Sequence, residues 1–194
     1  MITDMIQRKE QIEEAVKVLR AGGILLYPTD TIWGIGCDAT NEKAVERVFE
    51  IKNRVDSKSL IILACDMDMV ARYVREIPDM AVTVESLSDK PLTIIYPEGV
   101  NLAPNVTAED GSIAIRIPKH DFCVELVRRF GKPIVSTSAN VSGTPAPRRY
   151  VDIPDSIKAA VNLCVDPSFD QGATGRASSI IKLGLRNEVQ VIRE

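Results

Sequence analysis

The stretch Lys132-Pro-Ile-Val-Ser-Thr-Ser-Ala-Asn-Val-Ser-Gly143 indicates how this chain folds. It predicts a short buried strand over residues 133–135 that runs directly into small hydroxyl and amide side chains. An open α/β sheet places its ligand site beyond the carboxyl ends of its strands, on a rigid support of this kind. The same residue types also build ordinary turns, so the stretch taken alone slightly favours a turn.

A second stretch of the same design is Gly23-Ile-Leu-Leu-Tyr-Pro-Thr-Asp-Thr-Ile-Trp-Gly34. Its apolar run, residues 24–27, is bounded by glycines and a proline and predicts another buried strand. Asp30 follows between two threonines, where it could bind a cation, orient its neighbours or simply serve the turn. Two such junctions in one chain favour a binding site over two unrelated turns.

The remaining pattern interleaves helices and strands, which predicts an α/β fold. We expect one domain over residues 1–194, with a twisted mixed sheet flanked by helices, because the last two strands form a hairpin across residues 185–187. In residues 112–117 the isoleucines alternate with Arg116, which therefore points to the opposite face of the sheet. Four helices are expected over residues 9–21, 69–75, 79–88 and 155–160. Two more are expected from their ends: one is capped by Thr40 or Asn41, and the other is capped by Asp121 and ends at Gly131. The expected strands are 24–27, 60–65, 92–96, 112–117, 133–135, 161–165, 178–183 and 188–192.

Composition limits the classes of function. The formal net charge of −3 gives no global attraction to nucleic acid, so anion binding requires a local cluster of cations. The four cysteines are widely spaced and His120 is the single histidine, so the sequence argues against a Cys/His zinc site. The cysteines are typical of reduced core residues in a cytosolic protein, and no apolar stretch reaches membrane-spanning length. We therefore expect a soluble, cytoplasmic protein with no membrane partner.

Lysines and arginines gather near the predicted ends of helices and strands. Lys52, Arg54 and Lys58 bracket one such junction, Arg116 projects from a strand, and Arg193 borders another. Each one alone is most simply a solvated surface residue. Several converging donors, however, are what a polyphosphate requires.

Familiar catalytic motifs are missing from the sequence. It contains no P-loop, no glycine-rich dinucleotide fingerprint and no Gly-x-Ser-x-Gly elbow, and Gly34-Ile-Gly36 is interpreted as a turn. His120 next to a predicted helix start is more typical of a structural or capping role than of a catalytic base. The predicted chemistry is positioning and charge neutralisation rather than covalent catalysis.

Four ordered motifs together resemble the YrdC/Sua5 family. They are Pro28-Thr-Asp-Thr31 with Gly34, Lys52-Asn-Arg54 with Lys58-Ser-Leu60, Arg116-Ile-Pro118, and Ser138-Ala-Asn140 with Ser142-Gly143. The resemblance extends from about Gly22 to Arg193, and the length is similar to that of the short YrdC form.

The resemblance implies a YrdC-like fold with a positively lined concave face. It also implies synthesis of L-threonylcarbamoyladenylate from L-threonine, bicarbonate and ATP, with release of pyrophosphate. Partner proteins would then transfer the threonylcarbamoyl group to adenosine 37 of tRNA.

The resemblance also implies residue roles. Lys52 and Arg54 are the catalytic candidates, and Arg54 and Lys58 would hold the ATP phosphates, with Mg²⁺ accompanying ATP and no metal bound by the protein itself. Residues that would bind threonine are Thr31, Arg116, Ser138 and Ser178. Residues on the nucleotide side would be Ser112, Asn140 and Arg193.

Three positions depart from the family pattern. Trp33 replaces the usual Tyr and would keep an aromatic wall, Ser59 replaces Pro, and Arg148 stands where relatives have Ser or Thr, so it is assigned no nucleotide contact. Two alternatives remain open. One is a double-stranded RNA or tRNA-binding module of the same fold, and the other is a carbamoyl-adenylating enzyme for another substrate, as in hydrogenase-maturation carbamoyltransferases.

Overall fold

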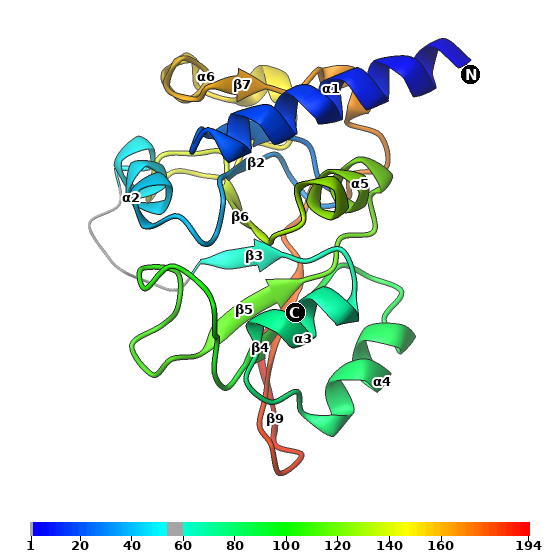
Figure 1. Cartoon of the computed structure of the whole chain (residues 1–194), viewed down its shortest axis with the longest axis vertical. Coiled ribbons are helices and arrows are strands. Elements are labelled where there is room, and N and C mark those ends of the chain that lie inside the picture. Colours follow the sequence, from blue (N-terminus) through cyan, green and yellow to red (C-terminus); the bar gives the residue numbers. More distant parts are fainter. Residues whose placement is uncertain (1, 54–59) are drawn as a thin grey trace.

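A computed structural model describes residues 2–53 and 60–194, and its helices and strands are labelled in Figure 1. The helices are α1 Ile2–Arg20, α2 Glu42–Ile51, α3 Met67–Tyr73, α4 Asp79–Leu87, α5 Asp121–Phe130 and α6 Asp155–Ala160, with 3-10 turns at Tyr150–Asp152 and Pro167–Phe169. The strands are β1 Leu25–Tyr27, β2 Gly34–Gly36, β3 Ile61–Leu63, β4 Leu92–Tyr96, β5 Ile113–Arg116, β6 Ile134–Ser138, β7 Leu163–Cys164, β8 Ser179–Leu183 and β9 Val189–Arg193.

The strands of the described residues form one sheet in the order β7-β1-β2-β6-β3-β5-β4-β8-β9. Three pairs are parallel (β1 with β7, β3 with β5, β4 with β8), and the others are antiparallel. The predicted α/β fold with a mixed sheet is therefore confirmed. The hairpin of β8 and β9 at one edge is confirmed as well.

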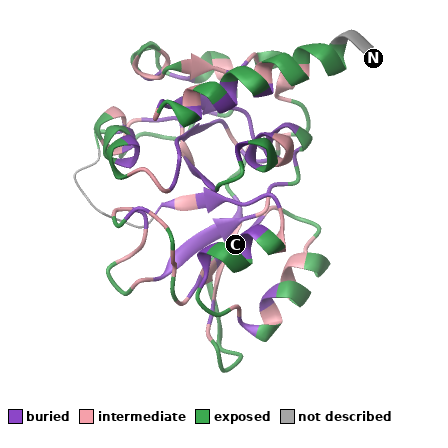
Figure 2. Ribbon diagram, viewed as in Figure 1, coloured by how far each residue is buried: buried purple, intermediate pink, exposed green. Residues whose placement is uncertain are grey.

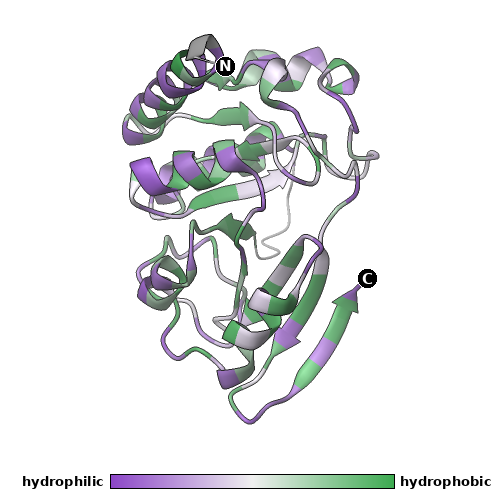
Figure 3. Ribbon diagram, turned by 90° about the vertical axis from the view of Figure 1, so that its right-hand side faces the viewer, coloured by the Kyte–Doolittle hydropathy of each residue, from purple (hydrophilic) through white to green (hydrophobic). Residues whose placement is uncertain are grey.

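Helices cover the sheet and bury its apolar side chains. Helix α1 packs against α5 and β1 through a stripe that includes Ile12, Ala15 and Leu19, which are fully or almost fully buried. Figure 2 shows buried residues through the central strands and exposed residues on the outer sides of the helices, whereas the edge strand β9 is exposed. Figure 3, from the side, shows the same division as mainly hydrophobic strands and hydrophilic outer helix faces. No helix in the described part of the chain is long and apolar enough to cross a membrane.

Strand β2 corrects the interpretation of Gly34-Ile-Gly36 as a turn. The segment lies inside the sheet, antiparallel to β1 on one side and to β6 on the other. A Cβ atom at Gly36 would stand 2.2 Å from the Val135 carbonyl oxygen and 2.7 Å from Cε1 of Tyr27. The glycine is needed because the neighbouring backbone and ring leave no room, and a glycine-rich triplet carries too little apolar pattern to predict a strand.

Strand β6 is longer than predicted, because it includes the hydroxyl residues that were expected to form a loop. Ser136 pairs with Ile61 of β3, and Ser138 pairs with Gly34 of β2. Two neighbouring strands therefore hold the hydroxyl-bearing residues in a fixed register. The polar loop begins only after Ser138.

Two helix starts test the predicted caps. Asn41 caps α2 through its side-chain oxygen, which accepts a hydrogen bond from the Ala44 amide at 3.2 Å. Asp121 does not cap α5 as predicted, because it is the first residue of that helix; the cap position is His120, which makes no side-chain capping bond. Gly131 ends α5 in the left-handed conformation, as predicted.

Candidate functional site

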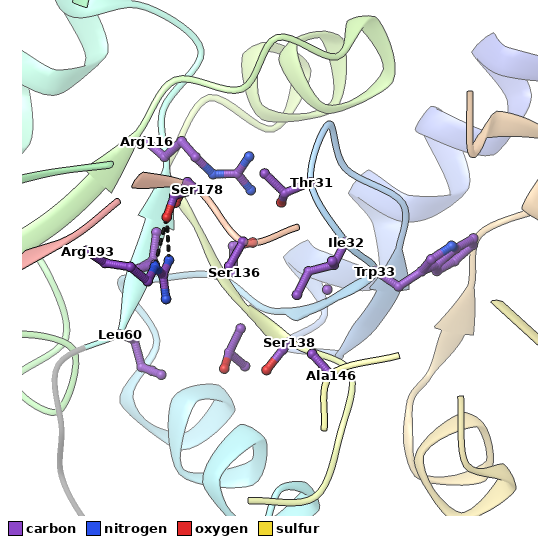
Figure 4. A pocket seen from close by; sticks show the side chains of 14 residues that line it. Thr31, Ile32, Trp33, Leu60, Arg116, Ser136, Ser138, Ala146, Ser178 and Arg193 are labelled. Carbon is purple, nitrogen blue, oxygen red and sulfur yellow. Dashed lines mark hydrogen bonds between the residues drawn. The ribbon is translucent and has the colours of Figure 1, made fainter. Parts of the chain in front are cut away.

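The ends of several strands surround a cavity of about 300 Å³ (Figure 4). It lies where β2 and β6 meet β3, the end of β5, the start of β8 and the end of β9. The described residues that line it are Thr31, Ile32, Trp33, Gly34, Leu60, Ile61, Arg116, Ser136, Thr137, Ser138, Ala146, Ala177, Ser178 and Arg193. Five of the predicted site residues, Thr31, Arg116, Ser138, Ser178 and Arg193, are thus brought together.

Arg116 supplies a fixed positive charge at the wall of the cavity. It is the last residue of β5, only 4% exposed, and its Nη1 pairs with Oδ1 of the equally buried Asp30. The second oxygen of Asp30 accepts the backbone N–H of Lys119 at 3.0 Å. Because its charge is paired on one side, the guanidinium can be held at a site from which bulk water is largely excluded.

The hydroxyl of Thr31 is oriented by its neighbour Thr29. The Thr29 oxygen lies 2.8 Å from the Ile32 carbonyl oxygen and 2.8 Å from the Thr31 hydroxyl oxygen. A carbonyl can only accept, so Thr29 donates to Ile32 and the Thr31 hydroxyl donates to Thr29. The lone pairs of the Thr31 oxygen are then free to accept a hydrogen bond from a ligand in the cavity.

Arg193 and Ser178 form the side of the cavity contributed by β8 and β9. The guanidinium of Arg193 donates to the Ser178 carbonyl from Nε at 2.9 Å and from Nη2 at 2.6 Å, as the dashed lines in Figure 4 show. The Ser178 hydroxyl is 2.7 Å from that of Thr93. Partial burial, and secondly the positive charge of Arg116, lower the pKa of Arg193. An anion bound in the cavity would relieve the repulsion between the two guanidinium groups.

Lys52 and Asn140 were predicted to contact substrate, but neither is among the described residues that line the cavity. The ammonium of buried Lys52 donates to the carbonyl oxygens of Ser138 and Asn140, the latter at 2.8 Å, and lies 3.4 Å from Oδ1 of Asn140. The Asn140 amide nitrogen donates in turn to the carbonyls of Val141 and Thr144. These bonds fix the loop that follows β6 and presents Ser138 to the cavity.

Ser112, another predicted nucleotide contact, also lies outside the described lining. It is buried just before β5, and its amide donates to Oδ1 of Asp110 at 2.9 Å. Hydrogen bonds from the Ser112 hydroxyl and amide lower the pKa of the Asp110 carboxyl to about 2. In this structure Ser112 therefore closes a turn.

Arg54 and Lys58 lie outside the described residues, and Arg148 is exposed and does not line the cavity. Trp33 is among the lining residues, but Figure 4 shows its indole directed away from the other labelled side chains. Its Nε1 donates to Asp170 at 2.7 Å, and its ring centroid lies 4.9 Å from that of Tyr150.

His120 is buried, with Nε2 3.1 Å from the Phe169 carbonyl oxygen, and burial lowers its pKa. Within residues 2–53 and 60–194, no group of three or more His, Cys, Asp or Glu side chains could hold a metal ion.

Several cavity residues were given no role by the sequence pattern. Ser136 was included in the polar stretch interpreted as a site but was assigned no substrate contact. It lies two positions before Ser138 on β6, and this spacing is typical of side chains on one face of a strand. Asp30, which does not line the cavity but pairs with Arg116, was given three open interpretations by the sequence: a cation ligand, a group that orients its neighbours, or a turn residue. Ile32, Ala177 and the adjacent pair Leu60 and Ile61 come from three separate segments of the chain and carry no common sequence signal.

Comparison with known proteins identifies relatives over most of the chain. The family model Sua5/YciO/YrdC, described as "Telomere recombination", matches residues 17–194. A threonylcarbamoyl-AMP synthase of Stenotrophomonas maltophilia is 42% identical over 146 residues, which are 73% of this chain and 78% of its relative. The threonylcarbamoyl-AMP synthase of Escherichia coli K12 is 34% identical over 148 residues, 75% of this chain and 77% of that protein.

Solved structures of Sua5 and YciO proteins resemble the fold of this chain. The crystal structure of P. abyssi Sua5 complexed with L-threonine superposes with a TM-score of 0.79 at 28% identity; the match covers 89% of this chain but only half (50%) of the longer protein. E. coli YciO superposes with a TM-score of 0.78 over 97% of this chain and 89% of its own, and at 22% identity it supports the fold alone.

Proposed function

This chain belongs to the Sua5/YciO/YrdC family, and on that premise we propose that it is a nucleotidyltransferase that makes L-threonylcarbamoyladenylate. Its substrates are L-threonine, bicarbonate and ATP, and pyrophosphate is released. The observation that carries the proposal is the gathering of Thr31, Arg116, Ser178 and Arg193 around one cavity in a chain whose curated relatives are threonylcarbamoyl-AMP synthases. A zwitterionic amino acid and a phosphate chain require this combination of cations and hydroxyl groups.

The amino-acid end of the cavity is assigned to Arg116, Thr31 and Ser178. The guanidinium of Arg116 takes the carboxylate of threonine, which suits its planar fork of donors. The Thr31 oxygen accepts from the amine, because its own proton goes to Thr29. Binding of L-threonine by the P. abyssi relative supports this assignment.

The nucleotide end is assigned to Arg193, with Arg54 and Lys58 on the phosphates of Mg²⁺·ATP, and Ser138 is assigned to the junction between threonine and the nucleotide. The threonine amine attacks the carbon of bicarbonate, a C–O bond of bicarbonate breaks and water leaves, which gives the carbamate. A carbamate oxygen then attacks the α-phosphorus of ATP, the bond between the α-phosphorus and the bridging oxygen breaks, and pyrophosphate leaves. Fixed cations stabilise the charge that develops on the phosphorus oxygens, and the bound geometry supplies proximity. Mg²⁺ bound to ATP would supply further neutralisation of the negative charge on the phosphates.

Lys52, Asn140 and Ser112 support the site by holding its loops. Their polar atoms bond within the chain, to carbonyl groups in the case of Lys52 and Asn140 and to Asp110 in the case of Ser112. This assignment separates the residues that position the cavity from those that touch its contents.

The wider setting belongs to the same proposal. Residues 1–194 act as one domain, and partner proteins transfer the threonylcarbamoyl group to adenosine 37 of tRNA. A cytoplasmic location accords with the cysteines, which are all free thiols, three of them buried.

The test is an assay of pyrophosphate release in which ATP, bicarbonate and L-threonine are each omitted in turn. We expect release only when all three are present, and a product with the mass of threonylcarbamoyladenylate. Release that does not depend on threonine would contradict the proposal and favour a different carbamoyl-adenylating activity. Salt-sensitive binding of RNA without any ATP chemistry would favour the RNA-binding module instead.

A further inference from the structure

We propose that Asp30 is a positioning residue that fixes the guanidinium of Arg116 so that its remaining donors face the amino-acid carboxylate in the cavity. This inference rests on the proposed function and adds a role for a residue that does not line the cavity. It follows from the contacts, burial and charges around Asp30.

The contacts of Asp30 account for both of its carboxylate oxygens. Oδ1 pairs with Nη1 of Arg116, and Oδ2 accepts the Lys119 amide at 3.0 Å. Asp30 is thus held between the loop after β1 and the segment after β5. A guanidinium bound to so fixed a carboxylate loses its freedom to rotate.

The N–H groups of Arg116 that do not pair with Asp30 are available to a ligand in the cavity. Asp30 and Arg116 are each 4% exposed, and Arg116 lines the cavity whereas Asp30 is not among the described residues that line it. Figure 4 shows the guanidinium directed across the cavity toward Thr31. Because a guanidinium presents its N–H groups in a rigid fork, fixing one edge also fixes the direction of the others.

The backbone of the same loop is tied on its other side. The carbonyl of Asp30 accepts the Thr174 amide at 3.0 Å, and that of Thr31 accepts the Gly175 amide at 2.8 Å. Asp30 therefore places Arg116 relative to Thr31, the two groups assigned to the carboxylate and the amine of threonine. Charge matters too, because burial and, secondly, the positive charge of Arg116 lower the pKa of Arg193, and the Asp30 carboxylate offsets the charge of Arg116.

The test compares binding of L-threonine with binding of L-threoninamide, which lacks the carboxylate, by isothermal titration calorimetry. The wild-type chain should prefer L-threonine. In Asp30→Asn that preference should fall by roughly tenfold to a hundredfold, the effect of misplacing a positioning group by about 1 Å. Asp30→Glu, which keeps a carboxylate, should restore part of it. A merely structural loss would weaken both ligands alike and leave the ratio unchanged.

The matched control is Asp38→Asn. Asp38 is also a buried aspartate paired with a cation, Lys132 at 3.0 Å, but it does not line the cavity. It should keep the wild-type preference. An unchanged preference in folded Asp30→Asn would overturn the proposal.

A second measurement uses the wild-type chain and so does not depend on the variant folding. Nitrogen-15 NMR should show slow rotation of the Arg116 guanidinium, and fast rotation would overturn the proposal. Both readouts are independent of turnover, so failure of the pyrophosphate assay would remove the proposed reaction while these results still decide the role of Asp30.

Discussion

Two polar regions meet at this cavity, and they use their polar groups in opposite ways. On the wall formed by Arg116, Thr31 and Arg193, side chains are partly paired and keep atoms directed at the cavity. In the loop after β6, Lys52 and Asn140 bond to carbonyl groups of the chain itself. In both regions the sequence offers only polar residue types at family-like spacing, so it does not show which region contacts the ligand. The direction of the hydrogen bonds shows which region is assigned to the ligand and which to its support.

The largest effect is expected from Arg116→Ala. Removing the guanidinium deletes the donor assigned to the threonine carboxylate, at a cost of about 2–5 kcal/mol in transition-state binding. The measurement is kcat/KM for L-threonine in the pyrophosphate assay. Arg128→Ala, on the exposed side of α5, is the control. An unchanged kcat/KM for threonine in Arg116→Ala would contradict the assignment of this wall to the ligand.

Lys52→Met should act on stability first. It leaves two buried acceptors of Asn140 and the partly buried Ser138 carbonyl without their ammonium donor, and each unsatisfied buried group costs about 1–3 kcal/mol. We expect a lower free energy of unfolding and faster hydrogen exchange in residues 138–144. Lys43→Met, exposed on α2, should change neither. A variant with wild-type stability but no turnover would instead place Lys52 in direct contact with substrate, as the sequence predicts.

Thr31→Val tests the wall with a smaller change. It keeps the shape but removes the hydroxyl that accepts from the amine, and a neutral hydrogen bond is worth about 0.5–1.5 kcal/mol. KM for threonine should rise, KM for ATP should stay constant, and Thr31→Ser should resemble the wild type. An equal rise in both KM values would show that Thr31 supports the cavity as a whole.

The smallest effect is expected from Ser112→Ala. Asp110 titrates near pH 2 in the folded chain, below its ordinary value of about 3.9. A lowered folded pKa contributes stability that is present above the unfolded pKa and lost as pH falls toward 2. In Ser112→Ala the pKa of Asp110, followed by NMR, should rise and this acid-sensitive stability should shrink. An unchanged Asp110 pKa with a higher KM for ATP would return Ser112 to the nucleotide.

Much of the fold could be predicted from the sequence, because periodic apolar residues determine strands such as β4 and β5 and helices such as α2. Strand β2 could not, since two glycines carry no apolar pattern and their role depends on the approach of Tyr27 and Val135. The motifs predicted the cavity residues Thr31, Arg116, Ser138, Ser178 and Arg193. They did not distinguish contact from support, because the partners of Lys52 and Asp30 lie 86 or more positions away in the chain.

The most direct measurement is a crystal structure of the chain with L-threonine bound. The carboxylate of threonine should accept hydrogen bonds from Arg116, its amine should lie at the Thr31 hydroxyl, and Lys52 should still hold the Ser138 and Asn140 carbonyls. Threonine bound to the Lys52 ammonium, with Arg116 turned away, would contradict the division into wall and support.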